Sequence, residues 1–249
     1  DPFVTVRTLE ELGFPADEAQ RWKKLTSKHH GIILVTGPTG SGKTTTLYST
    51  LKRLATDKVN VNTIEDPIEM VEASFNQSQV QSSIGFTFAE GLRSLLRQDP
   101  DIILVGEMRD LETMRMAMEA AETGHLVFGT VHTTDVAATI SRIVQMFPTE
   151  EQQAARVQLL SSLRFIIAQQ LLPKLGGGRV AAREFLEFTP DLRKKLLELN
   201  PATLFNELKD ATALEGITMM GAVRANYDKG LITPEELRRW ELILQEATT

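Results

Sequence analysis

The sequence predicts an α/β fold, in which a predominantly parallel sheet is covered by helices and followed by a helical C-terminal subdomain. Between Gly31 and Phe147, short apolar runs alternate with helical patterns. These runs are continuous and rich in β-branched residues, as is typical of strands buried on both faces of a parallel sheet. The second half of the chain is mostly helical in pattern. The alternation in the first half predicts helices on both faces of the sheet.

The strands are expected at the β-branched apolar runs. These runs are residues 32–35 (Ile-Ile-Leu-Val), 59–64, 102–105 (Ile-Ile-Leu-Val) and 126–128 (Leu-Val-Phe). A further strand is expected from Arg179 to Phe188, after a turn of three glycines. Because helical patterns separate the runs of the first half, these strands are expected to be parallel.

Helices are expected where a capping residue precedes an amphipathic pattern. Thr87 and Glu90 form a capping box, in which the hydroxyl and the carboxylate each accept from the other residue's backbone N–H. Asp110 can cap the next helix. Thr149 opens a long amphipathic helix that is expected to reach about Gln170.

Helix-start signals also follow the last expected strand. A capping residue precedes proline at positions 189–190, 200–201 and 233–234, and proline suits the first helical position. The last helix is expected to end near Ala247. One more helix is expected near the N-terminus, from Ala16 onward.

The length of 249 residues allows one large domain or two small ones. The patterns divide the chain into residues 1–30, a linker with an N-terminal helix, residues 31–188, the α/β core, and residues 189–249, the helical C-terminal subdomain. The sequence begins with Asp1-Pro2 and no Met. We therefore expect it to be a fragment of a longer protein.

Composition excludes several classes of protein. The chain has 27 Lys+Arg and 33 Asp+Glu, a net charge of −6, which argues against a nucleic-acid coat because such a protein needs excess positive charge. The chain has no cysteine, so disulfide scaffolds, thiolate nucleophiles and cysteine-based zinc sites are excluded. No apolar run approaches the roughly 18–20 residues that span a bilayer. No signal-peptide pattern opens the chain either.

The strongest local signal is the segment Gly-Pro-Thr-Gly-Ser-Gly-Lys-Thr at residues 37–44. It matches the phosphate-loop pattern and lies, as that pattern requires, between a buried strand and a helix. Its glycines let backbone N–H groups point at phosphates, and the helix N-terminus adds positive charge. Lys43 can reach the β- and γ-phosphates and the Thr44 hydroxyl can bind Mg²⁺. The expected nucleotide contacts are Pro38, Thr39, Gly40, Ser41, Gly42, Lys43, Thr44 and Thr45.

Hydrolysis also needs a group that orients and activates water. Glu107 follows the run 102–105 after one glycine and is expected beside the phosphate loop, where it can hold the attacking water or a Mg²⁺-bound water. The acidic run 65–69 follows another strand, and Glu69 is a candidate for a second water-orienting carboxylate. Asp66 and Arg109 adjoin these carboxylates and are expected to support them. The alternatives are a turn-capping role for Glu107 and a solvated turn for the acidic run.

Two of the four histidines flank an expected strand. His125 and His132 are an odd number of residues apart, so they point to opposite faces and cannot form one local metal pair. His132 is expected at the same edge of the sheet as the phosphate loop, where it can hydrogen-bond the γ-phosphate and report its loss. His125 lies at the opposite end, and a structural role remains open for both histidines.

Four segments together carry a resemblance to a known family. They are 37–44, 63–69 (Thr-Ile-Glu-Asp-Pro-Ile-Glu), 92–110 and 123–135, in this order. On these segments the sequence resembles the secretion ATPases of type II secretion, type IV secretion and type IV pili, in which they are called Walker A, Asp box, Walker B and His box. The resemblance covers about Thr8 to Thr189.

The resemblance implies a RecA-like P-loop NTPase core that binds ATP or ADP with Mg²⁺. It also implies a homo-oligomer, a hexameric ring that works as a motor. Lys43 and Thr44 match the family's nucleotide and Mg²⁺ contacts, and Glu107 matches its Walker B glutamate. Glu69 matches the Asp-box glutamate. His132 and His125 match the His-box pair.

Family members act at the cytoplasmic face of the bacterial inner membrane, so the resemblance implies a cytoplasmic, peripheral location. It implies inner-membrane platform or secretion-system proteins as partners, membrane contact only through them, and no direct contact with nucleic acid. Residues 7–13 resemble the linker that follows the family's N-terminal PAS-like domain. The arginines of that domain, which reach the γ-phosphate across a subunit boundary, have no counterpart that can be assigned.

Features of the sequence divide between the branches of the family. Residues 106–110 and 176–184 resemble the pilus-retraction ATPase PilT and its relative DotB of type IVB secretion, and the four-cysteine zinc module of GspE/PilB assembly ATPases is absent. Residues 75–80 and 85–88 resemble the assembly branch more. The stretch 189–196 lacks the Ala-Ile-Arg-Asn-Leu-Ile-Arg segment of retraction motors. The resemblance favours the PilT/DotB-like branch and leaves pilus retraction, type IV (IVB or conjugative) secretion and assembly open.

Two functions of other classes compete with a motor ATPase. A nucleic-acid translocase predicts a basic channel lined by aromatic residues, whereas this chain is acidic with 6% aromatic residues. A nucleotide-gated scaffold would bind ATP without turnover. The presence of both Glu107 and Glu69 argues against it.

Overall fold

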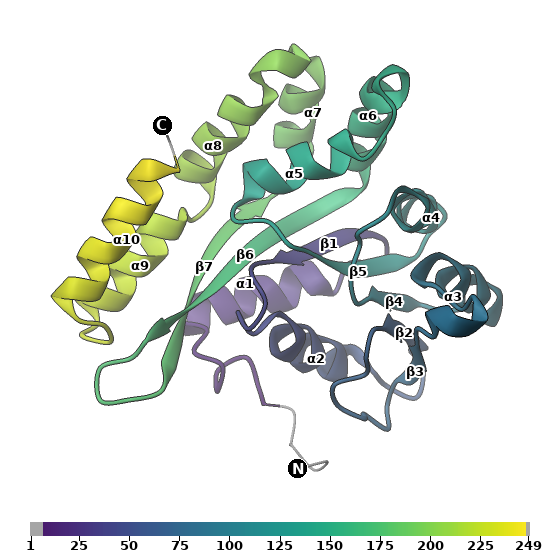
Figure 1. Ribbon diagram of the computed structural model, residues 1–249, viewed down its shortest axis with the longest axis horizontal. Coiled ribbons are helices and arrows are strands. Elements are labelled where there is room, and N and C mark those ends of the chain that lie inside the picture. The colour runs from purple at the N-terminus through teal and green to yellow at the C-terminus, as the bar shows by residue number, and fades with distance from the viewer. Residues whose placement is uncertain (1–6, 248–249) are drawn as a thin grey trace.

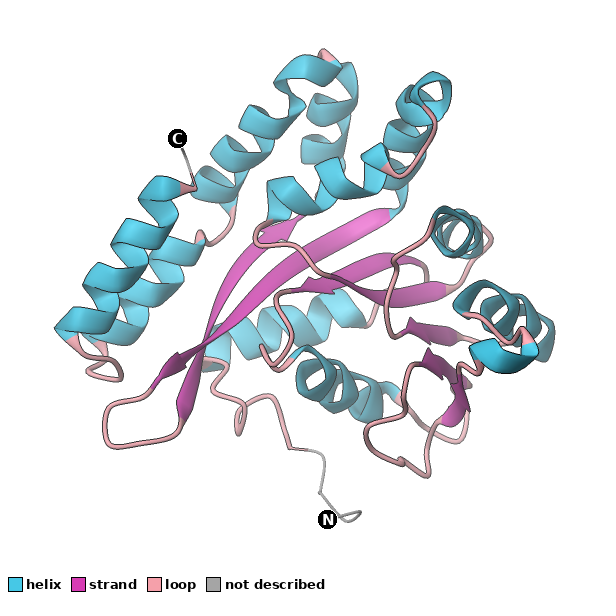
Figure 2. Ribbon diagram, viewed as in Figure 1, coloured by secondary structure: helices cyan, strands magenta, loops and turns pink. Residues whose placement is uncertain are grey.

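The computed structural model describes residues 7–247, which fold around one seven-stranded sheet (Figures 1 and 2). The strand order is β3-β2-β4-β5-β1-β6-β7. The strands are β1 (Gly31–Thr36), β2 (Val61–Glu65), β3 (Asn76–Gln79), β4 (Ile102–Val105), β5 (Leu126–Val131), β6 (Leu163–Pro173) and β7 (Arg179–Glu187). All neighbouring strands are parallel except β6 and β7, which form an antiparallel hairpin. The predominantly parallel α/β fold is therefore confirmed.

The sheet is buried because helices cover both of its faces (Figure 1). Every residue of β1, β2, β4 and β5 is buried. Along β1, Ile32 and Leu34 belong to one core cluster, whereas Ile33 and Val35 belong to the other. This alternation follows from the two-residue period of a strand, and it explains why both faces require apolar residues.

One face of the sheet packs against α1 (Ala16–Thr26) and α2 (Lys43–Leu54). The other face packs against α3 (Phe88–Leu95), α4 (Leu111–Glu122), α5 (Val136–Gln145) and α6 (Gln152–Ser162). The helix from Ala16, the Asp110 cap and the position of α4 are thus as predicted. Between residues 7 and 247, no helix combines the length and apolar character that spanning a membrane requires.

The chain after β7 is helical. It forms α7 (Pro190–Glu198), α8 (Leu204–Glu215), α9 (Met219–Asp228) and α10 (Pro234–Glu246). Thr189 and Thr233 cap α7 and α10 with their side chains, and proline occupies the first turn of both helices, as predicted. Helix α8 packs on α5, α9 packs on β7, and α10 packs on α9 (Figure 1).

The predicted helix from Thr149 to Gln170 is wrong in its second half. A short 3₁₀ turn and α6 end at Ser162, and Leu163 begins β6. Strand β6 pairs with β1 on one side and β7 on the other. These backbone hydrogen bonds come from residues far away in the sequence, and they outweigh a local pattern that suits a helix.

Two smaller features also differ from expectation. Only half of the capping box forms: the Glu90 N–H donates to the Thr87 hydroxyl, but the Glu90 carboxylate pairs with Arg93. Strand β3, a polar edge strand, has no apolar run that would reveal it and was not predicted. It forms because β2 offers a free edge to pair with.

Candidate active site

The functional candidates gather at the carboxyl edge of the sheet. Because β1, β2, β4 and β5 are parallel, the segments that follow them meet at one edge. The phosphate loop follows β1, the acidic run follows β2, Glu107 follows β4, and His132 follows β5. They line a cleft of about 980 Å³, a size typical of ligand sites.

The phosphate loop has the conformation that its glycines predict. Gly40 and Gly42 have φ of 80° and 85°, in the left-handed region, and α2 begins immediately afterwards at Lys43. Lys43 Nζ donates to the carbonyl oxygens of Gly37 (2.5 Å) and Pro38 (3.1 Å). Thr39, Gly40, Ser41, Gly42, Lys43, Thr44 and Thr45 all line the cleft.

A chain of polar contacts joins the loop to the ends of the neighbouring strands. Lys43 Nζ lies 3.4 Å from His132 Nδ1, and His132 Nε2 lies 3.3 Å from Glu107 Oε1. Arg109 then bridges Glu107 Oε2 (3.4 Å) and Asp66 Oδ2 (3.3 Å). The structure therefore brings together five of the residues that the sequence singled out, from four different segments.

The two contacts of His132 fit one form of its ring. A lysine ammonium can only donate and a carboxylate can only accept. A neutral imidazole with its proton on Nε2 satisfies both, because Nδ1 then accepts from Lys43 while Nε2 donates to Glu107. His132 thus links the cation of the loop to the carboxylate that was predicted to orient water.

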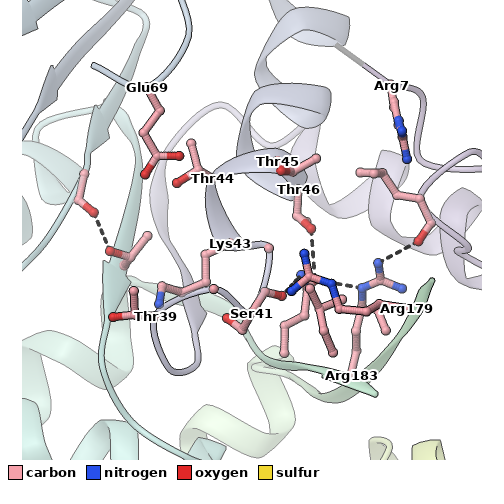
Figure 3. A pocket seen from close by; sticks show the side chains of 18 of the residues that line it. Arg7, Thr39, Ser41, Lys43, Thr44, Thr45, Thr46, Glu69, Arg179 and Arg183 are labelled. Atoms are coloured by element: carbon pink, nitrogen blue, oxygen red, sulfur yellow. Dashed lines mark hydrogen bonds between the residues drawn. The ribbon is translucent and has the colours of Figure 1, made fainter. Parts of the chain in front are cut away.

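Charge and burial act against each other at Lys43. Burial lowers the pKa of Lys43, whereas the carboxylates of Glu107 and Glu69 raise it. Glu69 lines the cleft, and Figure 3 shows its carboxylate directed toward Thr44. The carboxylates of Glu107 and Glu69 therefore lie close enough to influence the charge on the loop lysine.

The donors present fit a Mg²⁺ ion that is held mainly by phosphates. Among residues 7–247, no group of three or more His, Asp or Glu side chains is arranged to hold a metal ion. Mg²⁺ commonly keeps several waters and takes only one or two protein oxygens beside substrate phosphates. Thr44 supplies a hydroxyl on the cleft wall, and no hydrogen bond of this hydroxyl occurs within the described part of the chain.

The structure does not bring His125 to this cleft. His125 precedes β5 at the amino edge of the sheet, and its Nδ1 lies 2.9 Å from the carbonyl oxygen of Ala120. That contact ties it to the end of α4. The part that its match to the His-box pair implies for His125 stays a prediction.

The opposite wall of the cleft was not predicted. It carries four cationic side chains from the N-terminal segment and the β6–β7 hairpin: Arg7, Lys174, Arg179 and Arg183. Figure 3 shows Arg179 and Arg183 on the far side of the loop from Glu69. The sequence spacing of these four residues does not predict that they line the cleft. The β6–β7 hairpin lies beside the phosphate loop only because β6 pairs with β1.

Glu184 on β7 supports two helices at once. It is 8% exposed, and its carboxylate accepts from the backbone N–H of Val136, which begins α5, and of Met219, which begins α9. A carboxylate suits helix N-termini, whose N–H groups lack partners within the helix. Burial raises its pKa, while the two N–H groups lower it.

We expect Glu184→Ala to lower the free energy of unfolding by about 1–3 kcal/mol, because both helix N-termini lose a buried acceptor. Chemical denaturation measures this change. Glu187→Ala is the matched control on the same strand, since Glu187 forms a partly exposed ion pair with Arg21 and should cost at most about 1 kcal/mol. Equal losses in the two variants would contradict the proposed support by Glu184.

The sheet order and the loop together identify the class of protein. A phosphate loop follows β1, an interior strand, and β5 separates β1 from β4. Glu107 follows β4, and His132 lies between its carboxylate and the loop lysine. This arrangement is that of the P-loop ATPases, which bind nucleotide at the loop.

Within that class, the chain belongs to the family described as type II/IV secretion system protein, whose model matches residues 3–199. It is 47% identical over 239 residues to the type IV pilus retraction ATPase PilT of Pseudomonas aeruginosa, covering 94% of this chain and 68% of that protein. It is 44% identical over 242 residues to a twitching motility protein of Neisseria gonorrhoeae, covering 94% and 63%.

Solved structures agree with the sequence relatives. The ATPase DotB of Legionella pneumophila has a TM-score of 0.87 at 34% identity, covering 97% of this chain and 66% of that one. The pilus retraction motor PilT with bound ADP has a TM-score of 0.81 at 41% identity, covering 94% and 66%. The chain thus spans about two thirds of the length of these relatives.

Proposed function

We propose that the chain hydrolyses ATP with Mg²⁺ as the motor part of a ring-forming ATPase that powers type IV pilus retraction or a type IV secretion system. The contact chain from Lys43 through His132 to Glu107 carries this proposal. It joins a phosphate-binding cation to a carboxylate that can place water. A protein that only binds nucleotide has no need of the second group.

The residues divide the chemistry between them. The loop N–H groups and Lys43 stabilise negative charge on the phosphates, and the Thr44 hydroxyl would hold Mg²⁺. Glu107 orients a water and accepts its proton as the water oxygen attacks the γ-phosphorus. The bond from that phosphorus to the bridging oxygen breaks, and ADP takes the electron pair. Glu69 is proposed as the second carboxylate that orients this water.

His132 is proposed to sense the γ-phosphate. Its ring lies between Lys43 and Glu107, so a phosphate that draws Lys43 away changes one of its two contacts. The loss of phosphate after hydrolysis would restore that contact. His132 therefore connects the state of the nucleotide to the β5–α5 connection.

The proposed assembly is a hexameric ring at the cytoplasmic face of the inner membrane, docked on platform or secretion-system proteins. The family and the relatives named for pili and secretion support this part of the proposal. A ring also lets a neighbouring subunit supply an arginine to each phosphate site.

An assembly role is the second candidate. The chain is 42% identical over 242 residues to the type II secretion system protein E of Xanthomonas campestris, although it spans only 41% of that protein. The stretches 75–80 and 85–88, which resemble the assembly branch, lie at β3 and at the start of α3. Both candidates share the site chemistry and differ in the machine that the motor serves.

Phosphate release with and without a chelator tests the proposal. With Mg-ATP we expect steady release, and excess EDTA should abolish it, because charge on the phosphates is then unneutralised. Light scattering on the same samples gives the mass. Phosphate release confined to an oligomeric fraction supports the ring, and release at the same rate from monomer contradicts the ring. ATP binding without phosphate release would favour a nucleotide-gated scaffold.

A further inference from the structure

Arg183 on β7 is a buried cation that the proposed hydrolysis does not use. It is 7% exposed, and no carboxylate within residues 7–247 lies at ion-pair distance from it, although the charge of Glu18 acts on it from farther away. Burial lowers its pKa to about 10, so it is charged at neutral pH. A buried charge costs free energy unless other groups compensate it, so its contacts deserve a functional explanation.

The contacts of Arg183 join two parts of the molecule. On one side its guanidinium carbon lies 3.7 Å from the ring centroid of Phe14, and Nη2 donates to the Leu12 carbonyl oxygen at 3.1 Å. On the other side Nε donates to Gln169 Oε1 at 2.9 Å. Leu12 and Phe14 belong to the segment that precedes α1, whereas Gln169 belongs to β6.

Gln169 continues the path to the phosphate loop. Its Nε2 donates to the Ser41 carbonyl oxygen at 2.6 Å, and its Oε1 also accepts from the Thr46 hydroxyl at 2.9 Å. Gln169 is 2% exposed. Its amide thus uses both donor and acceptor ends, holding the middle of the loop and the first turn of α2 at the same time.

The loop is built around this contact. A Cβ atom on Gly37 would lie 2.3 Å from the Gln169 backbone carbonyl oxygen, and one on Gly42 would lie 2.9 Å from Gln169 Nε2 in the side chain. Gly37 therefore approaches the Gln169 backbone more closely than a residue with a side chain would allow, and Gly42 lies against the end of the Gln169 side chain. A shift of the Gln169 side chain would break its hydrogen bond to the Ser41 carbonyl and release the loop backbone at that point.

The geometry points to Gln169 and Arg183 as positioning residues that couple the segment Leu12–Phe14 to the phosphate loop, so that the seating of this segment controls nucleotide affinity. The inference rests on the proposed nucleotide site and adds its regulation. A partner or domain that pulls on the N-terminal segment would loosen the Arg183 contacts, free the Gln169 amide and weaken the loop's hold on nucleotide. The cleft itself would stay intact.

A double-mutant cycle on ADP binding to the chain, measured by calorimetry, tests the coupling. Phe14→Leu removes the aromatic ring beside Arg183 and keeps the position apolar. We expect it to weaken ADP binding about threefold to tenfold, less than the roughly 30-fold that losing a desolvated cation–π contact would correspond to, because only part of that free energy reaches the loop. Leu25→Ala is the control, because Leu25 is buried in the same core cluster at the far end of α1. It should leave ADP binding unchanged.

Gln169→Glu separates the coupling from simple stability. The carboxylate still accepts from Arg183 and Thr46, and it gives Arg183 an anionic partner, but it cannot donate to the Ser41 carbonyl. The added negative charge weakens ADP binding by itself. The decisive quantity is therefore the further fold-change in ADP affinity that Phe14→Leu causes when Gln169→Glu is already present. We expect that effect to disappear in the Gln169→Glu background. Arg183→Lys provides a second background, since an ammonium cannot span the Phe14, Leu12 and Gln169 contacts together.

Each outcome decides one question. Loss of the Phe14→Leu effect in either background, with unfolding curves that show folded protein, supports the coupling. The same fold-change of ADP affinity in all backgrounds, or no effect of Phe14→Leu on the parent chain, overturns it. A parent chain that fails to bind ADP overturns the proposed nucleotide site instead.

Discussion

Glu107→Gln is expected to reduce ATP turnover by about 10²–10⁴-fold, the range for removing a general base. Glutamine keeps the shape of the side chain and can still contact His132, but it cannot take the proton of the attacking water. ADP binding should persist, because the phosphate loop and Lys43 are unchanged. Phosphate release and ADP titration on the same preparation measure the two properties separately.

Glu112→Gln is the matched control for this variant. Glu112 is exposed on α4, where it pairs with Arg93, and it does not line the cleft. Its replacement should leave turnover at the parent rate. Turnover in Glu107→Gln equal to that of Glu112→Gln would mean that another group places the water, and Glu69 would then be the first residue to replace.

Lys43→Ala is expected to lower both nucleotide affinity and turnover, with turnover falling by about 10²–10³-fold or more, as when a single charge-stabilising group is removed. Lys43 is the cation at the start of α2, and its ammonium contacts the loop carbonyls and His132. Alanine removes all these contacts and leaves His132 facing only Glu107. ADP titration and phosphate release measure the two effects.

Lys52→Ala tests whether the effect depends on position. Lys52 lies in the last turn of the same helix, where it forms a partly exposed ion pair with Glu72. Its loss should change stability by at most about 1 kcal/mol and should not change turnover. Unaltered ADP binding in Lys43→Ala would contradict the assignment of this lysine to the phosphates, whatever the control shows.

The two variants separate binding from chemistry. Glu107→Gln should bind nucleotide without turning it over, whereas Lys43→Ala should do neither. The nucleotide-gated scaffold predicts a different pattern: Glu107→Gln would then resemble the parent chain, since neither turns over. The pair therefore also distinguishes the two classes of function that the sequence left open.

Several elements of the fold could be predicted because their signals are local. The buried runs at 32–35 and 102–105 identify strands by composition alone, and they became β1 and β4. Thr189 with Pro190 marks a helix start through groups within one turn of each other. Residues 163–173 could not be assigned in the same way, because their apolar pattern suits a helix as well as a strand.

Some residues of the candidate site could likewise be predicted from the sequence, and others could not. The phosphate loop, Glu107 and His132 could be placed together from sequence, since each follows a parallel strand and parallel strands share a carboxyl edge. The contacts of Gln169 and Arg183 could not. These two residues lie on a hairpin whose first strand was read as helix, so no spacing in the chain connects them to the loop.

The local sequence thus determines the conformation of the phosphate loop, whereas the tertiary structure determines which side chains surround it. The residues from Gly37 to Thr44 carry their own conformation, because glycine permits the left-handed turns and the following helix supplies the dipole. Which side chains surround that loop depends on strand order, since β6 reaches the loop only by pairing with β1. Long-range backbone pairing carries no local signature, and for that reason the cationic wall and the coupling through Gln169 emerge only from the folded structure.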